Sequence, residues 1–363
     1  MPWRDVSMLD EFLSEARAVK GASSLVVSPF GGALLHVAGR PRLFEKFTGA
    51  DCTALSNELV ESLEDDHRMQ LDGRGDVTVR LSSPRYGVVR AHLYRSSGAV
   101  AVAFRFHHDE PPRFDTLGWP APILEWTKVG QGFVPITGPL DSGKTTLLAS
   151  LVRAMADVAD RVIWVIESPQ EYAFRAPFVS HIAVGPRADA ATYSDAVRSA
   201  LRAQAKVIVI GEMFVVGEDG EVVAESDTIG AAFKAADAGA LVFGTLHAPS
   251  LGNALERMID AFPVAQERRY RRLLADYFVG GVSIRLIPRQ DGHGVVGASE
   301  LVTRHDAIRE MILRGDVSGL RNVVQTSEGM HSLESQLQQL VDQRSITAAD
   351  ARLAAARPSE IVG

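Results

Sequence analysis

Cysteine is scarce in this sequence, in which Cys52 is the single cysteine among 363 residues. One cysteine cannot form an internal disulfide, and it excludes a zinc site built from several cysteines. Long apolar runs are also missing, since no stretch approaches the ~20 consecutive apolar residues of a membrane-spanning helix. The formal net charge is −7, which argues against a general nucleic-acid-binding surface. We therefore expect a protein of the reducing cytoplasm that reaches a membrane only through a partner.

Length and composition indicate a folded protein of about two domains. Of the 363 residues, 46% are hydrophobic, so the chain can bury sizeable cores. This composition argues against intrinsic disorder and against a coiled coil.

One motif dominates the sequence between Phe133 and Leu148, where FVPITGPLDSGKTTLL reads as a strand, a glycine-framed loop and a helix. Four of its residues match G-x-x-x-x-G-K-[ST], the phosphate-binding P-loop. Loop amides and the positive end of the following helix can surround phosphate only where glycines let the backbone approach closely. We predict ATP binding, with a contact set made up of Gly138, Pro139, Leu140, Asp141, Ser142, Gly143, Lys144, Thr145 and Thr146.

Within this loop, the motif assigns separate tasks to a lysine and a threonine. Lys144 is expected to meet the β- and γ-phosphates, and the hydroxyl of Thr145 is expected to hold Mg²⁺. A carboxylate opposite the loop is needed to complete the metal site, because Mg²⁺ and its waters prefer oxygen ligands.

Three later apolar runs each end in a polar side chain, which is the pattern of strands in an open parallel sheet. Glu167 follows the first run and Glu212 the second, while His247 follows the third. Glu212 is expected to organise Mg²⁺ together with Thr145, and Glu167 to position or deprotonate an attacking water. For His247, a packed side chain and a catalytic one remain equal alternatives.

The chain before the P-loop has a different pattern. A helix over 5–20 and another over 53–70 accompany two groups of short strands, the second over 76–106. We predict an α+β domain over 1–110, a proline-containing linker over 111–122, a P-loop α/β core over 123–303, and two or three helices within 304–363. Residues 214–228 are predicted to form a β-hairpin inside the core.

Two groups of basic residues allow more than one interpretation. Arginines at 80, 85, 90, 95 and 105 fit a solvated strand face, or a set of side chains that reach phosphates held by a neighbouring subunit. The run Arg268–Arg272, interrupted by Tyr270, fits a nucleic-acid contact, but a solvated helix face or a subunit contact is favoured.

Four blocks of sequence together carry a family resemblance. They are GPLDSGKTT at 138–146, VIESPQEY at 165–172, VIGEM at 209–213 and AGALVFGTLH at 238–247. In order and spacing they resemble the secretion ATPase superfamily, and the chain looks most like the PilT-type retraction ATPases of type IV pili. AIREMI at 307–312 is similar to the AIRNLI signature of retraction motors. The tetracysteine zinc element usual in pilus-assembly and type II secretion motors is excluded by the cysteine count.

The resemblance implies a homo-hexameric ring in which a PAS-like N-terminal domain and a RecA-like C-terminal domain close on ATP. It implies that Glu167 lies in the Asp box, Glu212 in Walker B and His247 in the His box, and that Arg80, Arg95 and Arg105 reach the neighbour's phosphates. By the same likeness the ring would be cytoplasmic, peripheral at a bacterial inner membrane, bound to a platform protein there, and without direct contact to nucleic acid. It would hydrolyse ATP to power pilus retraction and twitching motility.

Some positions depart from the family pattern. Ser168 replaces an aspartate of the Asp box, Ala240 replaces the first histidine of the His box, and Phe214 replaces an arginine. These departures leave two alternatives: an ATPase of the DotB and TraJ group that serves conjugation or type IVB secretion, and a regulatory ring with impaired hydrolysis.

Overall fold

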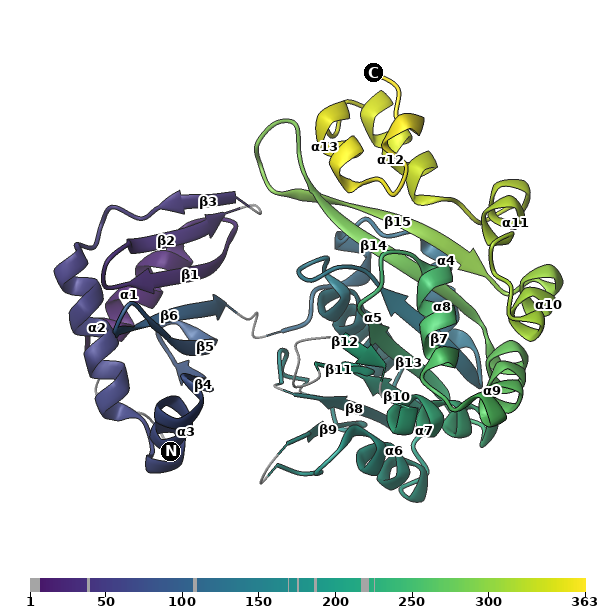
Figure 1. Cartoon of the computed structure of the whole chain (residues 1–363), viewed down its shortest axis with the longest axis horizontal. Helices are drawn as coiled ribbons and strands as arrows, with labels where there is room; N and C mark the ends of the chain where they lie inside the picture. The colour runs from purple at the N-terminus through teal and green to yellow at the C-terminus, as the bar shows by residue number, and fades with distance from the viewer. Residues whose placement is uncertain are drawn as a thin grey trace. The chain divides into compact units, whose positions relative to one another are not determined.

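The computed structural model describes residues 7–37, 40–106, 110–168, 170–174, 176–185, 188–216, 222–224 and 226–363. The chain divides into two compact units (Figure 1). One unit comprises Met1–Asp109 with Asp291–Val295, and the other comprises Glu110–Gln290 with Val296–Gly363.

The first unit is an antiparallel sheet covered by helices. Its described strands form a six-stranded sheet in the order β3-β2-β1-β6-β5-β4. Helices pack on one face, where apolar strand residues alternate inward and meet the apolar side of each helix. The strands are β1 (Ala22–Ser28), β2 (Gly32–Val37), β3 (Arg40–Leu43), β4 (Asp76–Ser83), β5 (Gly87–Ser96) and β6 (Ala99–Phe106), and the helices are α1 (Ser7–Ala18), α2 (Gly49–Ser62) and α3 (Asp65–Arg74).

The helical prediction over 53–70 is confirmed except at one break. Leu63 and Glu64 have extended backbone angles, with ψ values of 138° and 153°, and they separate α2 from α3. Because Leu63 is buried, the extended pair places an apolar side chain in the core at the point where the chain changes direction.

The second unit is built on a sheet whose central strands are parallel. Its described strands follow the order β15-β14-β7-β13-β10-β8-β9, and the pairs from β14 to β9 are parallel. Parallel strands bring their carboxyl ends to one edge, and ligands bind at that edge in open α/β sheets. These strands are β7 (Gly132–Thr137), β8 (Ile163–Glu167), β9 (Val179–Ala183), β10 (Val207–Ile210), β13 (Leu241–Leu246), β14 (Gly280–Pro288) and β15 (Val295–Thr303).

Helices cover both faces of this sheet, so its strands are apolar on both sides. In β7, Phe133 belongs to one apolar core, whereas Val134 and Ile136 belong to the other. The first core is closed by α6 (Tyr193–Arg202), α7 (Ser226–Asp237), α8 (Leu251–Asp260), α9 (Val264–Tyr277), α10 (Asp306–Arg314) and α11 (Leu320–Thr326). The second is closed by α5 (Lys144–Val158), α4 (Ala121–Glu125) and the 3-10 helices η1 (Phe114–Thr116) and η2 (Trp126–Lys128).

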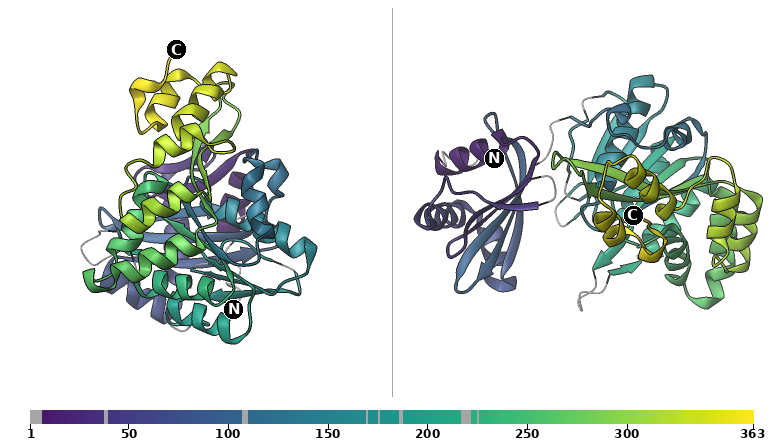
Figure 2. Two further views of the ribbon diagram at one scale, coloured as in Figure 1. Left: turned by 90° about the vertical axis from the view of Figure 1, so that its right-hand side faces the viewer. Right: turned by 90° about the horizontal axis from the view of Figure 1, so that it is seen from above.

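The C-terminal segment packs on the β14–β15 hairpin, beside which it lies in Figures 1 and 2. Its described helices from residue 304 onward are α10 and α11, followed by α12 (Leu333–Asp342) and α13 (Ala348–Ala354), with a last 3-10 turn η3 (Pro358–Glu360). The predicted number of two or three helices is therefore too low. Ile308 and Ile312 of α10 lie in the first core, so α10 belongs to the body of the unit.

In the second unit, the structure corrects the predicted linker, adds three strands and confirms the predicted hairpin. Residues 111–122 do not behave as a linker, because Phe114 and Trp119 are buried in the core under α5. Strands β9, β14 and β15 were not predicted. The hairpin is confirmed by β11 (Phe214–Val216), which pairs antiparallel with β12 (Val222–Ala224). In the part of the chain that is described, no helix has the length and apolar character needed to cross a bilayer.

The arginine run on α9 is interrupted by a core residue rather than by an exposed aromatic. Tyr270 is buried and stacks on Phe262, with ring centroids 3.5 Å apart. Of the flanking arginines, Arg271 pairs with Glu267 of the same helix at 3.1 Å. Since Tyr270 is not exposed for stacking on a base, a solvated helix face remains the better interpretation.

Phe233 offers a test of the aromatic core beneath α7. It is fully buried, and its ring meets that of Phe133 edge-to-face at a centroid distance of 5.1 Å. We expect Phe233→Ala to lower the free energy of unfolding by about 3–5 kcal/mol, because the lost ring leaves a cavity. Val264→Ala, at an exposed position of α9, should change it by less than about 0.5 kcal/mol. Urea titration measures both, and equal stability of the two variants would contradict this packing.

Candidate functional site

The P-loop is the connection between β7 and α5, and its backbone requires glycine. Gly138 has φ 152° and Gly143 has φ 91°. A Cβ atom at Gly138 would lie 2.5 Å from the Ile284 carbonyl oxygen and 2.6 Å from Ser142 Oγ. The loop therefore packs directly on β14, which leaves no room for a side chain at its first residue.

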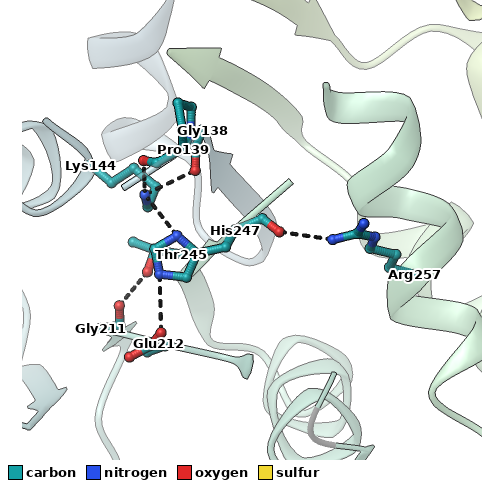
Figure 3. A network of polar contacts seen from close by, with 8 residues as sticks. All are labelled: Gly138, Pro139, Lys144, Gly211, Glu212, Thr245, His247 and Arg257. Atoms are coloured by element: carbon teal, nitrogen blue, oxygen red, sulfur yellow. Dashed lines mark hydrogen bonds and ion pairs between the residues drawn. The ribbon is translucent and has the colours of Figure 1, made fainter. Parts of the chain in front are cut away.

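Three predicted residues from three strand ends are in contact beside this loop (Figure 3). The Lys144 ammonium donates to the carbonyls of Gly138 at 3.0 Å and Pro139 at 2.7 Å. Lys144 Nζ is also 3.2 Å from His247 Nδ1, and His247 Nε2 is 3.1 Å from Glu212 Oε1. His247 thus bridges the P-loop lysine and the carboxylate that follows β10.

The partners of His247 assign its tautomer. An ammonium group can only donate, so Nδ1 accepts from Lys144. The ring proton then belongs on Nε2, from which it points toward the Glu212 carboxylate. The ring of His247 lies beside the P-loop, and its catalytic role stays a prediction.

Two side chains absent from the predictions support this bridge. Arg257 Nη1 on α8 donates to the His247 carbonyl at 3.1 Å (Figure 3). Thr245 Oγ1 donates to the Gly211 carbonyl and so ties β13 to the residue before Glu212. Arg257 lies ten residues after His247 and Thr245 lies 34 residues after Gly211, and no motif in the sequence points to either contact.

Glu167 is held by a partner that the sequence did not reveal. It is buried at the end of β8, and its Oε1 lies 2.8 Å from His181 Nε2 of β9. The Glu171 backbone N–H donates to the same oxygen at 3.0 Å. Glu171 therefore closes a turn through its backbone N–H.

The remaining P-loop residues occupy different environments. Leu140 is 77% exposed, whereas Ser142 is buried and its Oγ has no hydrogen-bond partner within the described structure. Thr145 is the second residue of α5. Thr146 Oγ1 lies 3.0 Å from the Tyr172 hydroxyl, a contact that links α5 to the segment after β8.

The two departures in the Asp and His boxes have different locations. Ser168 follows Glu167 directly and is exposed at the carboxyl edge of the sheet. Ala240 is buried immediately before β13, at the other end of that strand from His247. The replacement at Ala240 therefore lies away from the P-loop, and only Ser168 removes a carboxylate from this edge.

Of the three arginines predicted to act in trans, two lie in one row of the first unit's sheet and the third lies on its other face. In the register of β4, β5 and β6, Arg80 pairs with Arg90 and Arg90 pairs with Arg105. Arg95 lies on the other face of β5, the face of its buried residues, which the helices cover. Its Nη2 lies 2.7 Å from Asp72 Oδ1 of α3. Alternation along β5 separates Arg95 from the other two and brings Arg90 into their row.

Fold and site together define an α/β protein of the P-loop class. A family model described as type II/IV secretion system protein matches residues 121–268. A crystal structure of the pilus retraction motor PilT with bound ADP is similar over 97% of this chain and 98% of that one, with 30% identity and a TM-score of 0.79. The chain belongs to the type II/IV secretion ATPase family and is PilT-like.

Further relatives agree with this placement. The twitching motility protein of Neisseria gonorrhoeae is 27% identical over 81% of this chain and 77% of its own length. The type IV pilus retraction ATPase PilT of Pseudomonas aeruginosa is 28% identical over 81% of this chain and 83% of its own. The ATPase DotB of Legionella pneumophila, at 22% identity and a TM-score of 0.74 over 97% of this chain and 96% of that one, shares the fold.

Gly138→Ala tests the geometry of the loop. We expect it to weaken binding of a fluorescent ATP analogue at least about tenfold, because a Cβ there forces the loop away from β14. Gly130→Ala is the matched control, since a Cβ at Gly130 meets nothing within 4 Å. Fluorescence anisotropy measures both affinities. Equal binding by the two variants would mean that this loop does not hold the nucleotide.

Proposed function

We propose that this chain is a Mg²⁺-dependent ATPase and that it drives retraction of a type IV pilus as a ring motor. The observation that carries the proposal is the contact chain from Lys144 through His247 to Glu212 beside the P-loop. Its similarity to a pilus retraction motor and to a twitching motility protein favours this machine over the DotB-like alternative.

The residues of the site suit an in-line attack of water on the γ-phosphate. Lys144 and the loop amides would stabilise negative charge on the transferring phosphoryl group. Glu167, kept in place by His181 and the Glu171 amide, would orient the attacking water. His247 would hold Glu212 and the lysine ammonium in a fixed position relative to each other.

The residues present also fit the nucleotide and Mg²⁺. Ser142 Oγ is a buried polar atom without a partner, and Gly138 leaves a cradle that a Cβ would fill. No group of three or more His, Cys, Asp or Glu in the described residues is arranged to hold a metal by itself. Thr145 and Glu212 would therefore hold Mg²⁺ together with phosphate oxygens and water, and the ion would neutralise charge on the phosphates.

The ring and its domain types are part of the proposal. The order β14-β7-β13-β10-β8, with the P-loop strand second, supports a RecA-like core. A sheet with helices on one face supports a PAS-like first unit. In a hexamer, Arg80, Arg90 and Arg105 would reach the neighbour's phosphates, with Arg90 taking the place predicted for Arg95. A cytoplasmic ring would act on an inner-membrane platform protein.

Turnover and particle size test the proposal together. We expect phosphate release that needs Mg²⁺ and falls at least about 100-fold in Lys144→Ala and in Glu212→Gln. Light scattering should give a particle about six times the mass of one chain. Phosphate release is followed with and without EDTA.

Two other results would each support a different function. A ring that binds ATP without releasing phosphate would support the regulatory alternative, with Ser168 as its basis. DNA-stimulated turnover at physiological salt would favour a DNA-associated motor and contradict the proposal.

The arginine row makes a separate prediction. Arg105→Ala should lower turnover at least about tenfold while ATP binding to the P-loop stays within about twofold, because an arginine supplied in trans acts on the transition state. Arg74→Ala, at the exposed end of α3, is the control and should resemble the wild type. Equal turnover of both variants would mean that Arg105 does not act in ATP hydrolysis.

A further inference from the structure

The segment after β13, residues 247–251, is here called the His247 loop. Each of four backbone groups in it meets a side chain from elsewhere in the second unit. Arg257 Nη1 donates to the His247 carbonyl at 3.1 Å, and Thr137 Oγ1 donates to the Ala248 carbonyl at 3.1 Å. The other two partners come from the β14–β15 hairpin: Arg285 Nη2 donates to the Pro249 carbonyl, and Glu300 Oε2 accepts from the Leu251 N–H at 2.8 Å.

The two hairpin contacts tie the His247 loop to a part of the sheet that carries no predicted site residue. Arg285 lies on β14 and Glu300 on β15. Their contacts fix the loop at two neighbouring points, one at a carbonyl and one at an N–H. A shift of the hairpin relative to β13 would therefore move the loop, and His247 begins that loop.

The need to cap α8 does not explain why a carboxylate stands at position 300. The N-cap of α8 is Ser250, whose hydroxyl already accepts from the Asn253 N–H. Glu300 takes a different donor, the first N–H of the helix. A neutral acceptor would be enough for that bond.

Keeping Glu300 and Arg285 charged beside the His247 loop costs free energy, because both groups are partly buried. Burial raises the pKa of the Glu300 carboxyl, and the Leu251 N–H opposes that rise. Burial also lowers the pKa of Arg285. Apolar side chains often fill such space at less cost, and here both charged groups contact the backbone of the His247 loop.

We propose that Glu300 and Arg285 are positioning residues for hydrolysis. They hold the His247 loop so that the imidazole stays between Lys144 and Glu212. This inference rests on the proposed function, since it names residues that act through His247. It also makes the β14–β15 hairpin, on which α12 and α13 pack, a route by which the C-terminal helices reach the catalytic edge.

Steady-state kinetics of three variants test the role of Glu300. Glu300→Ala should lower kcat at least about tenfold with KM for ATP within about twofold, because the lost contact displaces a group that acts in the transition state. Glu300→Gln keeps an oxygen acceptor for Leu251 and should restore most of the activity. Glu256→Ala, an exposed position on α8, is the matched control and should equal the wild type.

A double-mutant cycle shows whether Glu300 acts through His247. In a His247→Asn background, Glu300→Ala should reduce kcat by less than about twofold further, since coupled residues are not additive. A full additional tenfold loss would overturn the proposal. So would wild-type kcat in Glu300→Ala.

Hydrogen exchange separates this inference from the proposed function. Residues 247–251 should exchange faster in Glu300→Ala than in the wild type, whether or not either protein turns over ATP. Absence of wild-type turnover would refute the ATPase proposal, while faster exchange in Glu300→Ala would still show that Glu300 holds the His247 loop. Unchanged exchange in the His247 loop would refute the positioning role alone, and Glu300→Gln provides the same comparison if the alanine variant fails to fold.

Discussion

The site depends on one imidazole that lies between an ammonium and a carboxylate. A lysine ammonium can only donate and a carboxylate can only accept, so a neutral histidine with its proton on Nε2 satisfies both. The three groups follow β7, β13 and β10, which are neighbours in the sheet. Their contact therefore requires that these strands end at the same level, as the parallel register provides. The P-loop and the carboxylate proposed to organise Mg²⁺ are brought together in this way.

The surroundings of the imidazole link it to α8 and to the β14–β15 hairpin. Its backbone is held by Arg257 from α8, and the loop that it begins is held by the hairpin through Arg285 and Glu300. The same hairpin provides Ile287 and Ala298 to the core under α12. Changes at the phosphate edge and at the C-terminal helices are thus connected through a short series of packed and hydrogen-bonded groups.

Local sequence predicted the centre of the site because its residues follow apolar strands or a glycine-framed loop. Lys144, Glu212 and His247 each stand at such a position, and the structure brings all three into contact. His181 escaped prediction because β9 is only half-buried along its length and has no apolar run. The sequence did not show on which face of the sheet Arg95 lies, because that face depends on the alternation and register of β5, and register is set by tertiary pairing.

We propose that His247 acts in hydrolysis and not in holding the nucleotide. The most direct measurement is kcat of His247→Asn beside the affinity of the same variant for a fluorescent ATP analogue. We predict that kcat falls about 10- to 100-fold while affinity stays within about twofold, because the bridge serves the transition state. Wild-type kcat in this variant, or a loss confined to nucleotide affinity, would contradict the claim.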